Sequence, residues 1–329
     1  MNPENHAENN NEIMVSIVCT VYNHEPFLKS TLEGFISQNT NFKFEAIIHD
    51  DASTDNSAEI IREYQKKYPD IIKPIYQTEN QYSQKRSILY NYLFPAAKGK
   101  YVAMCEGDDY WIDNHKLQKQ IDYMESHPEC TFCFTNAKCE ENGKISRNVI
   151  PWCNYSVVSS NNNYNVKQLE ELGYIPTCSF LFPRKCLDDM PVIDKKAFHG
   201  DGYLKLALTI QGYAHYIPET TCVYRFGVQN SSTTRWKNDA KVFSSYANKY
   251  ALMYRELNRV TNYEYNDLFE DRAVSWEVEN ILKAKNYKKM KEKQYKKYFK
   301  IRGKKALLRY YLICYFSPIY NLLKFLKGK

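Results

Sequence analysis

Two clusters of carboxylates follow apolar runs in the first third of the sequence. The segment His49–Asp55 comes directly after the run Phe44–Ile48, and the segment Glu106–Trp111 comes directly after Tyr101–Cys105. Short apolar runs that end abruptly in acids are typical of buried parallel strands with polar C-terminal ends. Because open α/β sheets bind ligands beyond that end of their strands, we expect both clusters to face one crevice.

The first cluster suits the base and ribose of a nucleotide. Asp51 stands at the strand end before any helix cap is needed, and Ser53 follows it. A carboxylate in that place can accept a hydrogen bond from the imide of uracil or from a ribose hydroxyl. Asp55 is better explained as a cap of the next helix, because Asp is a preferred N-cap residue.

The second cluster, Glu106-Gly107-Asp108-Asp109, is the strongest signal in the chain. Three acids within four residues repel one another unless a cation or hydrogen-bond donors compensate. Hard divalent cations prefer oxygen ligands, and Gly107 lets the backbone approach a ligand closely. These residues therefore predict a nucleotide diphosphate bound with a divalent metal.

Alternating strand and helix patterns place these clusters. The expected strands are Val15–Val21, Phe44–Ile48, Ile72–Gln77, Tyr101–Cys105 and Cys130–Asn136, and the helices between them are Glu25–Gln38, Ser57–Tyr68, Lys85–Ala97 and His115–His127. This order predicts an α/β fold with a mostly parallel central sheet and helices on both faces. The first strand ends in Thr20-Val21-Tyr22-Asn23, whose hydroxyl, aromatic and amide groups suit a nucleobase.

Beyond residue 136 the alternation becomes less regular. We expect a long loop at Asn142–Asn165, helices at Val166–Leu172 and Asp201–Gln211, strands at Thr177–Phe182, Ala214–Ile217 and Thr221–Phe226, and helices from Asn238 onward. A Rossmann-like domain over residues 13–237 would then precede a basic helical extension over 238–303 and a tail over 304–329.

The positive charge of the chain is local. The formal net charge is +7, but the stretch Lys283–Lys305 holds eleven Lys and one Arg against one Glu, so the rest of the chain carries −4. The aromatic content of 15% excludes general disorder. The polar leader over residues 1–12 is expected to be disordered and not a secretory signal, which favours reduced thiols and a cytoplasmic location.

The ten Cys residues are scattered as small apolar side chains would be. Cys130-x-x-Cys133 could suggest zinc, but both lie in or beside an expected strand and no fourth ligand stands at finger spacing. Burial is the favoured interpretation.

Taken in order, these motifs resemble those of a known enzyme family. Thr20–Asn23, His49–Asp55, and Glu106–Trp111 with Lys116-Leu117 following are similar to the successive signatures of the family-two inverting glycosyltransferases of the GT-A fold. The resemblance implies that Thr20, Tyr22 and Asp51 hold the base and ribose, with Asn23, Ser53 and Gly107 beside them. It also implies that Asp108 binds a divalent metal, Mg or Mn. Glu106 departs from the commoner Asp at the first acid of a D-x-D-like element.

Two residues further along complete the site that the resemblance implies. Asp201, in His199-Gly200-Asp201, resembles the position of the catalytic base, although an Asp there would also cap the helix that follows. Arg225 lies where relatives often carry Tyr-Arg-x-His near the diphosphate, and this chain has Gly227 in place of that His. A planar guanidinium there could neutralise phosphate or form a surface salt bridge.

The implied reaction moves a sugar, most plausibly from a UDP-sugar, to a hydroxyl in polysaccharide or lipid-linked glycan synthesis. The acceptor wall would come from Trp152, from the Asn142–Asn165 loop and from Thr177–Phe182. The alternatives are a nucleotidyltransferase, which would need a Gly-rich phosphate loop that Tyr22-Asn23-His24 does not offer, or a non-catalytic nucleotide-sugar binding module.

The C-terminal tail is expected to touch a membrane. Apolar residues at helical spacing run through Ala306–Leu326, interrupted by Pro318 and preceded by the lysines. Such a basic amphipathic pair of helices can lie in the headgroup region of an anionic membrane, which predicts a peripheral protein at the inner face of the cell membrane. The alternative is a helical hairpin packed on the catalytic domain or on a second subunit. Nucleic acid is not an expected partner, because nothing resembles a base-reading module.

Overall fold

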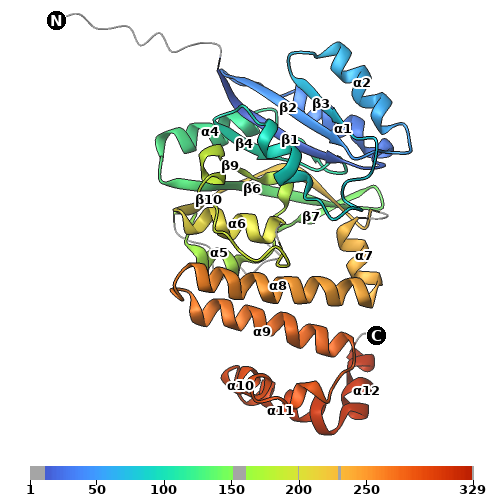
Figure 1. Ribbon diagram of the computed structural model, residues 1–329, viewed down its shortest axis with the longest axis vertical. Coiled ribbons are helices and arrows are strands. Elements are labelled where there is room, and N and C mark those ends of the chain that lie inside the picture. The colour runs from blue at the N-terminus through green and yellow to red at the C-terminus, as the bar shows by residue number, and fades with distance from the viewer. Residues whose placement is uncertain (1–11, 151–160, 199, 229–230, 328–329) are drawn as a thin grey trace, which may run out of the picture. The chain divides into compact units, whose positions relative to one another are not determined.

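The protein is described by a computed structural model (Figure 1). The described residues are 12–150, 161–198, 200–228 and 231–327. Most of the predicted leader, Trp152 and His199 therefore lie outside them.

The chain divides into two compact units. The first consists of Met1–Met190 with Lys205–Val228, and the second of Pro191–Leu204 with Gln229–Lys329. The first unit holds the sheet, whereas the second is helical. Residues 191–204, which sequence reasoning places in the catalytic domain, belong to the second unit.

A ten-stranded sheet forms the centre of the first unit, in the order β3-β2-β1-β4-β9-β6-β10-β5, with β7 beside β6 and β8 beside β10. The strands are β1 (Ile13–Val21), β2 (Lys43–Asp50), β3 (Ile72–Tyr76), β4 (Tyr101–Met104), β5 (Tyr110–Trp111), β6 (Cys130–Glu141), β7 (Lys144–Asn148), β8 (Asn163–Tyr164), β9 (Leu181–Pro183) and β10 (Tyr213–Phe226). The long ladders β3-β2-β1-β4 and β6-β10 are parallel. The predicted α/β fold with a mostly parallel sheet is confirmed, and short antiparallel strands extend it.

Helices cover both faces of this sheet (Figure 1). Alternate residues of β1, among them Val15, Ile17 and Cys19, join one hydrophobic core with α1 (Glu25–Ile36), α2 (Ser57–Lys67) and α4 (Lys116–Ser126). Elsewhere in the sheet, Phe182 of β9 meets Phe94 of α3 (Phe94–Ala96) edge to face, with ring centroids 6.0 Å apart. Two-sided burial explains why the central strands are apolar throughout rather than alternating.

The order of the strands creates a crevice beside β1. The chain passes from β1 to β2 and β3 on one side and then returns to β4 on the other side of β1. Because all four strands are parallel, their C-terminal ends at Val21, Asp50, Tyr76 and Met104 lie at the same edge. Such a reversal of strand order is where α/β sheets bind ligands.

Three predicted elements of the first unit are wrong in detail. The expected helix Lys85–Ala97 begins only near Leu89, as a π-helical turn over Leu89–Leu93 that α3 continues, because Lys85 adopts a left-handed conformation with φ +63°. Thr177–Ser179 forms a 3-10 turn before β9 instead of strand. The two strands expected at Ala214–Ile217 and Thr221–Phe226 are one strand, β10, with register shifts between Ile217 and Cys222.

The expected loop Asn142–Asn165 contains structure at both ends. Asn142 and Gly143 have φ of +51° and +72° and turn β6 into β7, while β8 and the Asn165 cap of α5 (Val166–Leu172) close the segment. Two consecutive positive φ values match the type I′ hairpin that Asn-Gly favours. Residues 151–160 lie outside the described residues.

The second unit is built from helices (Figure 1). They are α7 (Ser232–Asn238), α8 (Ala240–Val260), α9 (Asn266–Lys283), α10 (Lys293–Ile301), α11 (Lys304–Tyr315) and α12 (Ser317–Lys327). α6 (Asp201–Ile210) begins in this unit and continues into the first. Among the described residues, no helix has the length and apolar character needed to cross a bilayer.

Candidate functional site

The two acidic clusters lie on either side of the end of β1. The backbone N–H of Asp51 donates to the carbonyl of Val21 at 2.9 Å, and that of Gly107 donates to the carbonyl of Thr20 at 2.9 Å. These carbonyls belong to neighbouring residues of one strand. The fold therefore gathers the clusters at one edge of the sheet, although Asp51 and Asp108 are 57 positions apart in sequence. Tyr22 follows directly, with 44% of its surface exposed.

Asp51 is more deeply engaged than the sequence suggests. Its side chain is 4% exposed, and its two carboxylate oxygens accept hydrogen bonds from the backbone N–H groups of Gln81 at 2.7 Å and Tyr82 at 3.0 Å. Its carbonyl also accepts from the Asn80 side chain. Asp51 thus fixes the loop after β3 at the crevice edge, while each oxygen keeps a second lone pair for a ligand.

Asn23 and Ser53 join the loops that follow β1 and β2. The Ser53 hydroxyl accepts from the N–H of Asn23 at 2.9 Å, and the Asn23 side-chain oxygen accepts from the N–H of Thr54 at 2.7 Å. Both residues were predicted to contact the nucleotide. In the structure these groups shape the crevice wall through each other, and a direct ligand contact stays a prediction.

Asp55 serves two helices. Its carboxylate accepts from the N–H of Ser57 at the start of α2 and from the N–H of Glu25 at the start of α1, each at 3.0 Å. Burial alone would raise the pKa of Asp55, but the hydrogen bonds from Ser57 and Glu25 outweigh it and hold the pKa below its ordinary value. Asp55 therefore stabilises the starts of both helices as a cap would, although the N-cap position of α2 is Asn56.

The acid loop, defined as Glu106–Asp109, is held from below by a helix. The hydroxyl of Thr31, a fully buried residue of α1, is 2.6 Å from the carbonyl oxygen of Asp109 and 3.0 Å from that of Gly107. Sequence reasoning missed Thr31. A single Thr on the inner face of an amphipathic helix gives no local signal of this role.

Gly107 has no room for a side chain. A Cβ at this position would lie 2.7 Å from Nδ1 of His24 and 2.9 Å from Cγ2 of Val21. The missing side chain therefore lets the acid loop pack against the end of β1. A ligand contact of Gly107 stays a prediction.

The side chain of Arg225 is largely buried, and hydrogen bonds fix its guanidinium. Its side chain is 11% exposed, its guanidinium donates to the carbonyl of Asp108 at 2.8 Å and to the Ser30 hydroxyl at 3.0 Å, and its backbone N–H donates to the Asp109 carboxylate at 2.8 Å. The guanidinium also lies over the ring of Tyr110, 4.3 Å from the centroid. Arg225 is thus a clamp on the acid loop. The salt bridge that the sequence offered as an alternative is present, with Glu140, but it is largely buried and not on the surface. Contact of Arg225 with a phosphate stays a prediction.

A neighbouring carboxylate completes the clamp. Glu140 of β6 lies 3.5 Å from Nε of Arg225 and accepts a hydrogen bond from the Tyr110 hydroxyl at 3.0 Å. Residues of α1, β5 and β6 therefore all contact the guanidinium of Arg225, which β10 places next to the acid loop. Buried Arg in such a planar, stacked setting is not replaceable by Lys.

The electrostatics of the loop favour a cation. Burial, and then the carboxylates of Asp108 and Glu106, raise the pKa of Asp109, against the opposing hydrogen bond from Arg225. After burial, the same acids raise the pKa of the Cys19 thiol on β1. Within the described residues no three His, Cys, Asp or Glu side chains form a complete metal cage. The donor set fits a cation held by one or two carboxylates, with a diphosphate supplying further oxygens.

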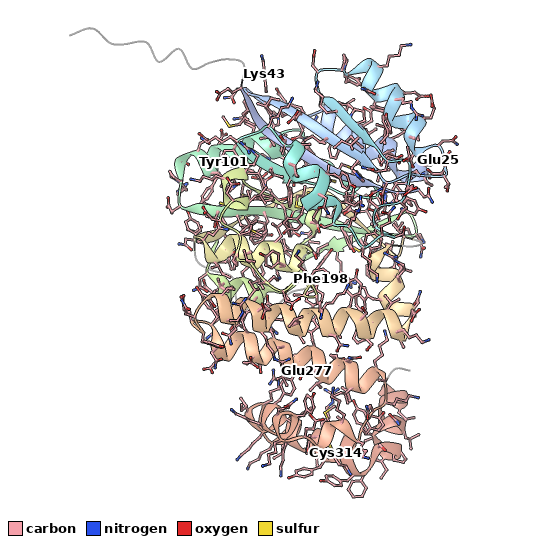
Figure 2. The ribbon with its side chains drawn as sticks, in the orientation of Figure 1. Glu25, Lys43, Tyr101, Phe198, Glu277 and Cys314 are labelled. Carbon is pink, nitrogen blue, oxygen red and sulfur yellow. The ribbon has the colours of Figure 1, made fainter. Side chains whose placement is uncertain are left out.

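Asp201 is the first residue of α6 and lies in the second unit. An aromatic stack holds the segment before it: Phe198 stacks on Tyr250 of α8 at 4.2 Å between centroids, and Tyr250 stacks on Trp276 of α9 at 4.4 Å. The Phe198 N–H also donates to the carbonyl of Lys249 at 3.1 Å. Figure 2 shows Phe198 just above α8.

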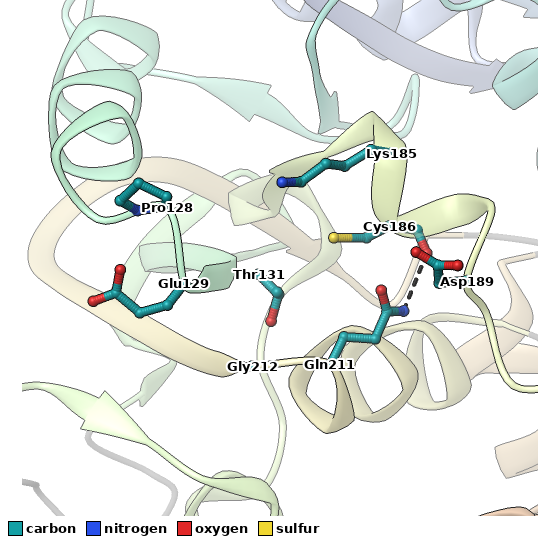
Figure 3. Close-up of a pocket in the computed structure, with 8 residues that line it drawn as sticks. All are labelled: Pro128, Glu129, Thr131, Lys185, Cys186, Asp189, Gln211 and Gly212. Atoms are coloured by element: carbon teal, nitrogen blue, oxygen red, sulfur yellow. Dashed lines mark hydrogen bonds between the residues drawn. The ribbon is translucent and has the colours of Figure 1, made fainter.

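A separate cavity of about 460 Å³ lies elsewhere in the first unit (Figure 3). It is lined by residues around the starts of β6 and β10, among them Thr131, Lys185, Asp189 and Gln211. Since the acid clusters lie at the opposite ends of the parallel strands, this cavity is not part of the crevice. Cys130 and Cys133 on β6 are buried, as expected.

Comparison with known proteins identifies the family. The model of glycosyl transferase family 2 matches residues 16–189, which include both acidic clusters. The chain belongs to glycosyl transferase family 2. It is 36% identical over 228 residues to the uncharacterized protein Rv1520 of Mycobacterium tuberculosis, a match that covers 67% of this chain and 62% of that relative.

Other proteins similar to this chain carry names that state an activity. One is the UDP-Glc:alpha-D-GlcNAc-diphosphoundecaprenol beta-1,3-glucosyltransferase WfaP of Escherichia coli, 33% identical over 133 residues, 40% of this chain and 49% of that protein. Among solved structures, the mannosyltransferase PcManGT of Pyrobaculum calidifontis, in complex with GDP-Man and Mn2+, aligns with a TM-score of 0.55 at 14% identity, covering 94% of this chain and 88% of that one. The latter likeness supports the GT-A fold.

Proposed function

We propose that this glycosyltransferase family 2 protein moves a sugar from a nucleotide-diphosphate donor to an acceptor hydroxyl with inversion at the anomeric carbon. The observation that carries the proposal is the pair of backbone hydrogen bonds that set Asp51 and the acid loop on the adjacent Val21 and Thr20 carbonyls. In that arrangement one crevice would offer the Asp51 carboxylate as a hydrogen-bond acceptor for a nucleoside, and a cluster of acids for a metal-bound diphosphate.

The donor is proposed to be a UDP-sugar, of hexosyl or N-acetylhexosaminyl type. Asp51, half-buried Thr20 and exposed Tyr22 would contact uracil and ribose, and Tyr22 offers an aromatic face for stacking. The E. coli relative named for UDP-Glc supports this choice, whereas the archaeal neighbour is named for GDP-Man. Both bases should therefore be tested.

The proposed cofactor is Mg or Mn, held by Asp108 with Glu106 beside it. When bound, the cation would neutralise charge that grows on the departing diphosphate. The chain itself would position the acids. Thr31 and Arg225 bond to the backbone carbonyls of Gly107, Asp108 and Asp109, and so would keep the backbone of the acid loop fixed while the donor binds.

Asp201 is the proposed base. Its carboxylate would take the proton of the acceptor hydroxyl as that oxygen bonds to the anomeric carbon and the bond from that carbon to the diphosphate breaks. One displacement inverts the configuration. The aromatic stack of Phe198, Tyr250 and Trp276 supports this role, because a base needs a fixed backbone near the reacting groups.

A donor panel tests the activity. Purified protein is supplied with UDP-glucose, UDP-galactose, UDP-N-acetylglucosamine, UDP-N-acetylgalactosamine and GDP-mannose, and nucleoside diphosphate release is measured with and without EDTA. We expect one UDP-sugar to be turned over, and EDTA to abolish the turnover. Asp201→Asn should remove at least about 99% of transfer while leaving UDP binding intact.

Two other classes predict different results in the same assay. Pyrophosphate release from a nucleoside triphosphate would indicate a nucleotidyltransferase. Binding of UDP-sugar without turnover of any donor, unaffected by Asp201→Asn, would indicate a binding module. Either result would overturn the proposal.

The acceptor is proposed to be a growing glycan or a lipid-linked sugar, and the site of action the cytoplasmic inner face of the cell membrane. The name of the E. coli relative includes a diphosphoundecaprenol acceptor, which supports a membrane-bound substrate. Of the residues expected to form the acceptor wall, Trp152 lies outside the described residues and Thr177–Phe182 is buried. A panel of lipid-linked and free saccharides, scored by product mass, tests this assignment.

A further inference from the structure

Nine of the large apolar side chains exposed on the described surface fall within the 26 residues Ile301–Leu326. On α11, Leu308, Tyr311 and Tyr315 follow one helical face, and on α12 Ile319, Leu322, Leu323 and Leu326 do the same. Phe316 lies between the two helices and Ile301 ends α10. We call these nine residues the apolar face.

The helices that carry these exposed side chains do have a hydrophobic core. Tyr310 and Ile313 of α11 and Tyr320 of α12 are buried together with Met290, with Phe299 of α10 and with residues of α9. Figure 2 labels Cys314, another member of this core. The inner side of these helices therefore packs on other helices of the second unit, whereas the alternative expected from the sequence placed it on the catalytic domain or on a second subunit. The outer side of α11 and α12 is apolar again. A second, exposed apolar side is typical of an interaction surface.

Lysines border the part of the apolar face that α11 contributes. The ammonium of Lys291 lies 4.7 Å from the ring centroid of Tyr315, and that of Lys296 lies 5.6 Å from that of Tyr311. Lys304 and Lys305, both exposed, begin the helix that carries Leu308. The apolar face therefore has cations at its border, which an anionic lipid headgroup can pair while the side chains between them enter the acyl boundary.

The charge decides between the two obvious occupants. In a symmetric pair of chains the same patch meets itself, so Lys291, Lys296, Lys304 and Lys305 at its border would face their own copies. An anionic bilayer attracts every one of them.

We propose that the apolar face of α11 and α12, with its lysine border, is a preformed docking surface for an anionic lipid bilayer. Binding at this surface does not require sugar transfer. Its link to the proposed function is that a chain bound to the bilayer would lie where a lipid-linked acceptor is found.

Vesicle flotation tests the surface with the full chain. Wild-type protein should partition into vesicles of phosphatidylglycerol and phosphatidylcholine, and bind vesicles of phosphatidylcholine alone much more weakly. Replacing Leu322 and Leu326, which are 57% and 59% exposed, with Gln should lower the partition coefficient by at least about tenfold. The matched control replaces Ile145 and Val192, exposed by 57% and 85% but outside the apolar face, with Gln and should partition like wild type.

The lysine border has its own signature. Lys304→Gln with Lys305→Gln should weaken binding to the anionic vesicles by roughly 10- to 30-fold, at about 1 kcal/mol for each Lys, and should reduce the salt dependence. Circular dichroism of each variant checks that the helices persist.

Three results would overturn the proposal: no preference of wild type for anionic vesicles, equal partition of the Leu variant and its control, or a concentration-dependent dimer that the Leu variant abolishes. The last would assign the face to a second copy. Donor turnover with a soluble acceptor is measured in parallel. If wild type binds the vesicles but turns over no donor, only the proposed function is rejected. If wild type turns over a donor but does not bind the vesicles, only the docking surface is rejected.

Discussion

The hydroxyl of Thr31 offers the sharpest test of how the acid loop is held. Thr31→Val keeps the branched shape of the side chain but removes the donor that lies 2.6 Å from the Asp109 carbonyl and 3.0 Å from the Gly107 carbonyl. Losing the partner of a buried carbonyl costs about 1–3 kcal/mol, so the free energy of unfolding should fall by that amount. If about 1 kcal/mol of the cost appears as misplacement of Asp108, metal-dependent UDP binding should weaken about fivefold.

The measurements are urea unfolding followed by circular dichroism and titration calorimetry with UDP and Mn. Thr31→Ser is the matched control, because it keeps the hydroxyl and loses only a buried methyl group. We expect the Ser variant to bind UDP like wild type, with a stability loss of about 1 kcal/mol. Thr31 does not hold the acid loop in this way if the Val variant matches wild type in both stability and affinity, or if the Ser and Val variants lose affinity equally.

Three further predictions concern other parts of the structure. Arg225→Lys should lower the free energy of unfolding by about 2 kcal/mol or more and weaken UDP binding, because Lys cannot reproduce two donors and a stacked plane; unchanged urea midpoints would contradict this. Tyr250→Ala should reduce the turnover number at least about tenfold with unchanged affinity for UDP, whereas the exposed control Tyr263→Ala should change neither; equal effects on both would reject the positioning role. Burial, and then the charge of His127, lower the pKa of His215 from 6.5 to about 4. The unfolded chain therefore binds more protons between these values, and up to about 3 kcal/mol of stability should be lost as the pH falls from 6.5 to 4. His215→Gln should flatten that part of the unfolding curve, and an unaltered pH profile would argue against a neutral buried imidazole.

Local patterns carry the parts of the fold that could be predicted. β1, β2, β3 and β4 are short apolar runs, each near its expected position, and their order alone indicates a parallel sheet with a crevice at its C-terminal edge. The two acidic clusters needed only that inference to be brought together. That prediction did not require any contact between residues far apart in the sequence to be known.

The roles that sequence reasoning could not supply depend on contacts over long separations. Arg225 is 117 positions from Asp108, and its burial follows from the way β10 runs beside β6 and β5. Asp51 could be assigned to a strand end, but the loop that occupies its oxygens follows β3 and is shaped by Lys85. A side chain's type indicates what it can bond, and only the fold decides which partner reaches it.

One missed feature did have a signal. Asn142-Gly143 is the dipeptide that favours a type I′ turn, and it stands between residues that alternate in burial on β6 and exposed residues on β7. The Asn- and Ser-rich composition of the surrounding segment hid it. A hairpin would have been expected there had the turn been weighed before the composition.

Calorimetric titration of UDP into the protein in the presence and absence of Mn tests the central claim most directly. We expect wild type to bind UDP and Mn to tighten the binding, while Asp108→Asn should bind UDP with the same affinity whether or not Mn is present. No heat from wild type with UDP and Mn, or an equal effect of Mn on wild type and on Asp108→Asn, would contradict the claim that the acid loop and the end of β1 form one nucleotide-diphosphate site.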